Sequence, residues 1–123
     1  METTRTITLS GRTPVRIREH DWPIVAEAED DGYGGTDQGR HMQAVEQGEV
    51  DRFWLKVRRH ADGRAIVYGV RRAGWGGTDW RGGVVLAAGD DIATAIRRIG
   101  QEDDLPDRLI RECIADLPAV ELA

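Results

Sequence analysis

The chain contains no asparagine and only one serine, one lysine and one cysteine among its 123 residues. The single cysteine, Cys113, excludes an intramolecular disulfide, and the opening METTRTITLS lacks the basic and then apolar order of a secretory signal. We therefore expect a protein of the reducing cytoplasm. The longest apolar run, Val84 to Ala88, is far shorter than the roughly 20 residues of a membrane-spanning helix, so we expect a soluble protein without a membrane partner.

The shortage of nucleophiles narrows the catalytic options. Ser10 lies at the end of an expected strand without a nucleophile-elbow pattern, and Cys113 falls on the apolar face of an expected helix, where thiols are usually inert. His20, His41 and His60 lack the spacing of a metal-binding motif, and no cysteine cluster completes a zinc site. We predict no catalytic residue, no metal site and no cofactor. A small enzyme whose site no sequence pattern reveals is the remaining alternative.

Charge is unevenly distributed along this acidic chain, whose net charge is −5. Segments 1–18 and 50–88 carry +3 and +5, whereas segments 19–49 and 89–123 carry −8 and −5. Arginine supplies all but one of the basic residues, which we attribute to a GC-rich bacterial genome and not to an arginine-specific binding role. The acidic segments suit a basic partner surface, as in anti-defence proteins that imitate the charge of nucleic acids.

The N-terminal region predicts a hairpin followed by a helix. TRTITLS and PVRI alternate apolar and polar residues on either side of Gly11, as paired strands do. HDWPIVAEAEDD then places Asp21 at an N-cap and Pro23 in a first helical turn. The apolar stripe of this short helix would consist of Ile24, Val25 and Ala28.

The clearest pattern is DRFWLKVRRHADGRAIVYGVRR, two alternating runs joined at Asp62-Gly63, a preferred pair for a two-residue hairpin turn. This turn predicts a register in which Val57 pairs with Tyr68 and Trp54 lies near Arg71. The apolar face would then carry Phe53, Leu55, Val57, Ile66, Tyr68 and Val70. The opposite face would carry Trp54, Lys56, Arg58, His60, Ala65, Val67 and Arg71.

The C-terminal region predicts one more strand, from Val84 to Ala87, and two helices. The first helix follows Asp90 or Asp91 and stops at Gly100, and the second opens at Pro106. The predicted fold is therefore α+β, with an antiparallel sheet of about four to five strands around the central hairpin. The short N-terminal helix and the two C-terminal helices cover one face, in a single globular domain spanning residues 1–123.

Two stretches, DGYGGTDQGR (31–40) and AGWGGTDWRGG (73–83), share a core of glycine, an aromatic residue and Gly-Gly-Thr-Asp. Neither has the Gly-Lys-Ser/Thr ending or the helix context of a phosphate-binding loop. Glycine, threonine and aspartate are turn residues, so plain turns explain the repetition. The alternative is that the loops present Tyr33 and Trp75 to a ligand or partner.

The sequence thus predicts a small non-catalytic bacterial accessory or regulatory protein that binds another macromolecule. We expect a protein partner first, with an inhibitor or anti-defence factor as one form of this function, and with Tyr33, Trp75 and Trp80 as aromatic anchors. The alternative is a nucleic-acid-binding protein that uses the basic hairpin 52–72. In that case Trp54 stacks on bases, while Lys56, Arg58 and Arg71 contact phosphates. An exposed hairpin edge also allows a homodimer.

Overall fold

The computed structural model describes residues 3–30, 52–72 and 79–119. A first hairpin consists of β1 (Thr4–Leu9) and β2 (Arg12–Arg18), and a 3-10 helix, η1 (Glu19–Asp21), follows it. An antiparallel sheet then contains, in the order β3-β4-β5-β6, the strands Ile24–Asp30, Arg52–Arg59, Ala65–Arg72 and Trp80–Leu86. Two helices, α2 (Ile92–Glu102) and α3 (Asp107–Ala115), complete the described part.

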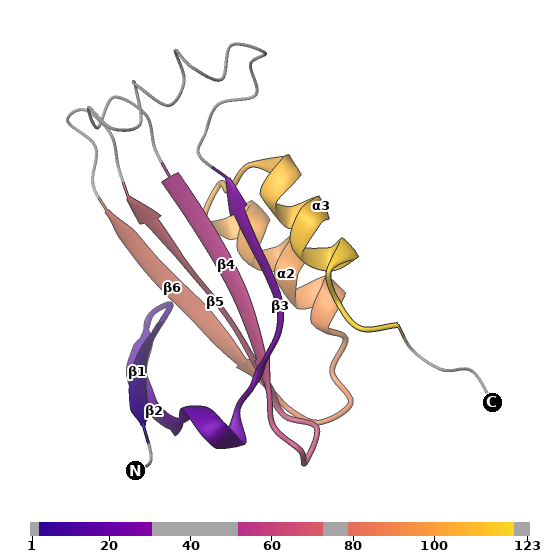
Figure 1. Cartoon of the computed structure of the whole chain (residues 1–123). Helices are drawn as coiled ribbons and strands as arrows, with labels where there is room; N and C mark the ends of the chain where they lie inside the picture. Colours follow the sequence, from indigo (N-terminus) through magenta and orange to yellow (C-terminus); the bar gives the residue numbers. More distant parts are fainter. Residues whose placement is uncertain (1–2, 31–51, 73–78, 120–123) are drawn as a thin grey trace.

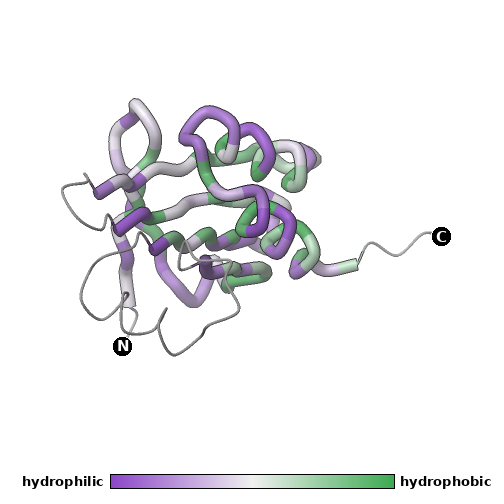
Figure 2. Tube along the Cα trace, turned by 90° about the horizontal axis from the view of Figure 1, so that it is seen from above, coloured by the Kyte–Doolittle hydropathy of each residue, from purple (hydrophilic) through white to green (hydrophobic). Residues whose placement is uncertain are grey.

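The arrangement is the mixed α+β fold with antiparallel strands that the sequence predicts. Helices α2 and α3 cover one face of the four-stranded sheet, and the β1–β2 hairpin lies against part of the other face (Figure 1). Hydrophobic and hydrophilic segments are interspersed along the chain trace (Figure 2). Neither described helix is long and apolar enough to cross a lipid bilayer.

The main core lies between the sheet and the two helices. Both helices bury an apolar stripe there, which includes Ile96, Ile99, Leu109 and Cys113. However, α2 continues past Gly100 to Glu102. Gly100 is buried where the helices meet, and a Cβ there would lie 2.1 Å from Cδ1 of Ile110. This glycine therefore permits close helix packing and does not end the helix.

The predicted N-terminal helix is wrong, because residues 24–30 form strand β3. This strand pairs with β4, and the register places Ala26 opposite Val57 on the helix side of the sheet. Ala26 is only 1 % exposed, whereas Glu27 lies on the other face. Pairing with a buried central strand outweighs the local helix-capping signals. The alternation Ala-Glu-Ala-Glu from residue 26 has the period of a strand.

The predicted β4–β5 hairpin exists, but its register is shifted by one residue. The loop contains three residues, Ala61 to Gly63, because the His60 N–H donates to the Arg64 carbonyl (2.9 Å) and the Gly63 N–H donates to the His60 carbonyl (2.9 Å). Gly63 has a φ of +97°, which suits a turn followed by a bulge with glycine in the left-handed region. Val57 therefore pairs with Val67 and not with Tyr68.

This shift exchanges the two faces of β5, since side chains alternate along a strand. Ala65 and Val67 join the core beneath the helices, whereas Ile66 packs against the β1–β2 hairpin. Tyr68 and Val70 therefore lie on the same face as Trp54. On β5, the face of Trp54 therefore carries Tyr68 and Val70, and not Ala65, Val67 and Arg71 as predicted.

Strand β6 begins at Trp80, four residues before the predicted start, and includes the glycines 82 and 83. The Trp80 indole takes the space that side chains would otherwise fill, because a Cβ on Gly82 would lie 2.5 Å from its Cζ2 atom and a Cβ on Gly69 would lie 3.1 Å from its Cζ3 atom. The tip of the first hairpin attaches to the same strand. The Ser10 N–H donates to the Gly83 carbonyl (3.0 Å), and the Gly83 N–H donates to the Ser10 hydroxyl (3.1 Å).

Asp103, just after α2, is expected to make stability fall with rising pH. Burial raises the pKa of its carboxyl group, and a hydrogen bond from Trp80 offsets part of this effect. A carboxyl whose folded-state pKa is raised stabilises the fold below its unfolded pKa and loses that contribution as pH rises through the folded pKa. In urea unfolding, wild type should therefore lose stability relative to Asp103→Asn between about pH 4 and about pH 7. Asp104→Asn, at the exposed neighbour, serves as control, and an equal difference at both pH values would contradict the argument.

Candidate functional site

The sheet face opposite the helices is only partly covered. At one end a second hydrophobic cluster joins the first hairpin to the sheet, and its buried members are Ile7, Leu9, Ile17, Trp22 and Ile66. Tyr68 packs against this cluster and marks its border. Beyond Tyr68, the face of β4, β5 and β6 forms a groove of about 410 Å³ that β1 bounds on one side.

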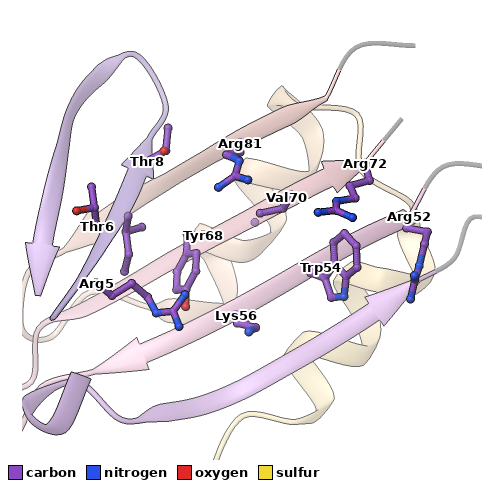
Figure 3. Close-up of a pocket in the computed structure, with 12 residues that line it drawn as sticks. Arg5, Thr6, Thr8, Arg52, Trp54, Lys56, Tyr68, Val70, Arg72 and Arg81 are labelled. Atoms are coloured by element: carbon purple, nitrogen blue, oxygen red, sulfur yellow. The ribbon is translucent and has the colours of Figure 1, made fainter. Parts of the chain in front are cut away.

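Side chains from four strands point into this groove (Figure 3). Five are cationic and two are aromatic, and the described residues of the lining include no carboxylate. The cations are Arg5, Arg52, Lys56, Arg72 and Arg81, and the aromatic residues are Trp54 and Tyr68. Thr6 and Thr8 of β1 and Val70 of β5 complete the lining that Figure 3 labels. In a chain of net charge −5, this is a local concentration of positive charge.

The strand register arranges these side chains in rows across the sheet. Arg52 lies opposite Arg72, Trp54 opposite Val70, and Lys56 opposite Tyr68. Arg81 extends the middle row, because it pairs with Val70. Neighbouring rows are two residues apart along each strand, or about 7 Å. Like charges directly opposite each other destabilise a sheet, so the Arg52–Arg72 pair is unfavourable for folding.

Two of the five cations have carboxylate partners at the border of the groove. Arg52 donates from Nη2 to Oε1 of Glu29 (2.6 Å), and Arg5 donates to Glu19. The hydrogen bond from Arg5 lowers the pKa of the Glu19 carboxyl group, and attraction from Arg58 and Lys56 adds to this shift. Within the described ranges, the Lys56, Arg72 and Arg81 side chains make no hydrogen bond or ion pair. Three cations of the groove are thus available to an anion.

The structure divides the four predicted nucleic-acid contacts into two groups. Trp54 and Lys56 line the groove, as expected for one face of β4. Arg58 is buried, with Nε donating to the Tyr68 hydroxyl (2.8 Å) and Nη1 donating to the Trp22 carbonyl (3.0 Å). Arg71 is absent from the groove lining, and its guanidinium carbon lies 5.8 Å from the Phe53 ring centroid.

Sequence reasoning missed Arg5, Arg52, Arg72 and Arg81. The incorrect register assigned Arg72 to the apolar face, and Arg81 belonged to an expected loop. Arg5 reaches the groove only through the packing of the first hairpin on the sheet, a long-range contact without a local signal. The position of Gly63 was the usable signal for the hairpin register. A glycine in the left-handed region also fits the last position of a three-residue loop, and that loop gives the register observed.

The predicted aromatic anchors differ in what the structure describes. Tyr33 and Trp75 lie outside the described residues. Trp80 is half-buried and packs against the main core. Its indole also donates a hydrogen bond to Asp103.

The described residues offer little for catalysis. Cys113 is fully buried, which raises the pKa of its thiol to about 11, and the Ser10 hydroxyl accepts the Gly83 N–H. The His60 ring packs on Trp22, with centroids 5.0 Å apart. No cluster of three His, Cys, Asp or Glu side chains suited to a metal ion occurs in the described part of the chain.

Comparison with protein-family models, with curated proteins and with solved structures gave no significant match.

Proposed function

We propose that the protein binds a nucleic acid in the groove of the β4–β6 face. One observation carries the proposal: five cations and two aromatic side chains converge in a single groove, and none of the described residues that line it is a carboxylate. Cations neutralise phosphates and release their counterions, and aromatic rings stack on bases. Both requirements of such a ligand are met in one place.

The acidity of the whole chain does not oppose this function at short range. Beyond about 10 Å, at an ionic strength near 0.1 M, salt screens most of the repulsion from distant carboxylates. Contacts within the groove are shorter, and Lys56, Arg72 and Arg81 belong to its lining, whereas Glu27, opposite Lys56 on β3, does not. Glu29 and Glu19, at the border, are already engaged by Arg52 and Arg5. The acidic remainder should instead slow association and limit binding to strands that fit the groove.

A protein partner receives less support from the described residues. Trp80, the only predicted anchor among them, packs against the core. The described surface also exposes few large hydrophobic side chains, with Ile24 at 40 % and Val85 at 37 % exposure, from two different edge strands. A central cluster of apolar anchors, which most protein interfaces need, is therefore not formed by these residues.

The test removes the three unpaired cations together, as Lys56→Gln/Arg72→Gln/Arg81→Gln. Binding of a fluorescent single strand of about 12 nucleotides is measured by anisotropy at several salt concentrations. Wild type should bind with an affinity that falls steeply with salt, and the variant should bind at least about tenfold more weakly near 0.1 M salt. Its logarithmic salt slope should be smaller by about two, since each phosphate contact contributes about 0.7 for single strands.

The matched control is Arg97→Gln/Arg98→Gln/Arg111→Gln, which removes the same charge from the exposed surface of α2 and α3. This control should retain the wild-type affinity and salt slope. Equal losses of affinity in both variants would show that binding depends on overall charge, and would contradict binding in the groove. No binding by wild type at low salt would reject the proposed function.

A further inference from the structure

The two aromatic residues of the groove occupy diagonal positions on neighbouring strands. Trp54 lies opposite Val70, and Tyr68 precedes Val70 by two residues. Diagonal neighbours of this kind are about 7–8 Å apart, which is close to the space that one planar ring needs between two others. The described residues show no ring contact between Trp54 and Tyr68. Both side chains stand on the same side of the sheet, with Val70 beside them (Figure 3).

Each of these rings is supported on the side away from the other. The Arg52 guanidinium carbon lies 5.2 Å from the Trp54 ring centroid, and Arg52 belongs to the row on the far side of Trp54 from Tyr68. Tyr68 packs against the hydrophobic cluster of the first hairpin, and its hydroxyl accepts the hydrogen bond from buried Arg58. Both rings are thus held before a ligand arrives, which reduces the entropy lost on binding.

The space between the Trp54 and Tyr68 rings, called the slot below, has surroundings that suit the backbone of a nucleotide. Lys56 is directly opposite Tyr68, and Arg81 is directly opposite Val70, so a cation lies next to the slot on either side. The floor is formed by the apolar side chain of Val70 and by the backbone of Gly69. An apolar floor favours a base, and the flanking cations favour its phosphates.

We infer that the ligand is single-stranded and that one of its bases stacks between Trp54 and Tyr68; this inference rests on the proposed function. In a duplex the bases are already stacked and paired, so they cannot enter a slot between two protein side chains without being unpaired. A duplex would offer only its phosphates to the cations at the rim. The slot therefore selects unpaired nucleotides, whereas the cations alone would not distinguish the two forms.

The test compares three probes with the same number of phosphates: a thymidine oligomer, the corresponding abasic strand and a hairpin duplex. A uridine oligomer is added, so that RNA and DNA are distinguished as sources of the unpaired base. Wild type should bind the thymidine or uridine oligomer between roughly 5-fold and 150-fold more tightly than the abasic strand, the range measured for one base on an aromatic side chain. The duplex should bind no more tightly than the abasic strand.

Two variants connect this preference to the slot. Trp54→Leu should lower the affinity for the thymidine oligomer to that for the abasic strand and leave abasic binding unchanged, whereas Trp54→Phe should restore most of the preference. Equal binding of the abasic strand and the oligomers by wild type would overturn the stacked base but leave phosphate binding in the groove intact. Tighter duplex binding would also overturn the inference. If no probe binds at low salt, the proposed function fails and the inference fails with it.

Discussion

Replacing Arg58 with alanine should lower the free energy of unfolding by about 3 kcal/mol, the scale of losing one member of a buried, charged hydrogen-bond network. Arg58 is only 5 % exposed. It donates to Tyr68 and to the Trp22 carbonyl, and its Nη2 atom lies 3.8 Å from Glu19. It thereby connects β4, β5 and the segment around η1. Truncation would remove this donor from the Tyr68 hydroxyl and the Trp22 carbonyl and open a cavity beneath the first hairpin.

The neighbouring Arg59 provides the matched control for this measurement. Arg59 is exposed at the end of β4, and its backbone N–H, which donates to the Pro23 carbonyl (3.1 Å), is unaffected by truncation of the side chain. Arg59→Ala should therefore change the free energy of unfolding by less than about 0.5 kcal/mol. Urea denaturation of the two variants and wild type at neutral pH compares them directly. If Arg58→Ala were as stable as Arg59→Ala, Arg58 would be a surface cation, as the sequence predicted, and would return to the set of phosphate contacts.

Local patterns predicted those parts of the fold that depend on neighbours in the chain. Helix α3 begins at Asp107 directly after Pro106, and the apolar stripes of α2 and α3 are buried as their spacing indicates. Strand β3 was missed because its conformation depends on pairing with β4 across the segment from 31 to 51. Short segments with caps at one end carry helix signals, but a buried partner strand supplies more stabilisation than a cap.

The site was harder to predict than the fold, because it depends on register and on distant packing. Trp54 and Lys56 were identified correctly as neighbours, since residues two apart on one strand share a face in any register. Arg71 and Arg72 lie on the opposite faces to those that the predicted register gave them, because the hairpin loop contains three residues and not two. Arg58 does lie on the predicted face of β4, but the region around Trp22 covers it. No local pattern shows that Arg58, unlike Lys56 on the same face of β4, is buried.

Replacing Trp80 with alanine should lower the free energy of unfolding by about 3–4 kcal/mol, the usual cost of truncating a tryptophan that packs in a core. Its indole packs against the main core and occupies the space above Gly69 and Gly82, which have no side chains to fill it. The change would also remove the hydrogen bond that the indole donates to Asp103. Because two adjacent strands, β5 and β6, carry glycine at these paired positions, the paired residues themselves supply no side chain to fill the cavity.

Trp54→Ala is the informative counterpart, since Trp54 is also a tryptophan on the sheet but lines the groove on the other face. It should cost no more than about 1 kcal/mol of stability, because its ring contacts the partly exposed Arg52 side chain and does not belong to the core that the described residues form. In thermal or urea unfolding, Trp80→Ala should therefore be clearly less stable than Trp54→Ala. In nucleic-acid binding, Trp54→Ala should be the more affected variant. Folded Trp80→Ala should bind like wild type, and Trp54→Ala should lose the preference for bases. A Trp80→Ala variant of unchanged stability would show that Trp80 is not needed for the core, and would return it to the set of side chains available to a protein partner.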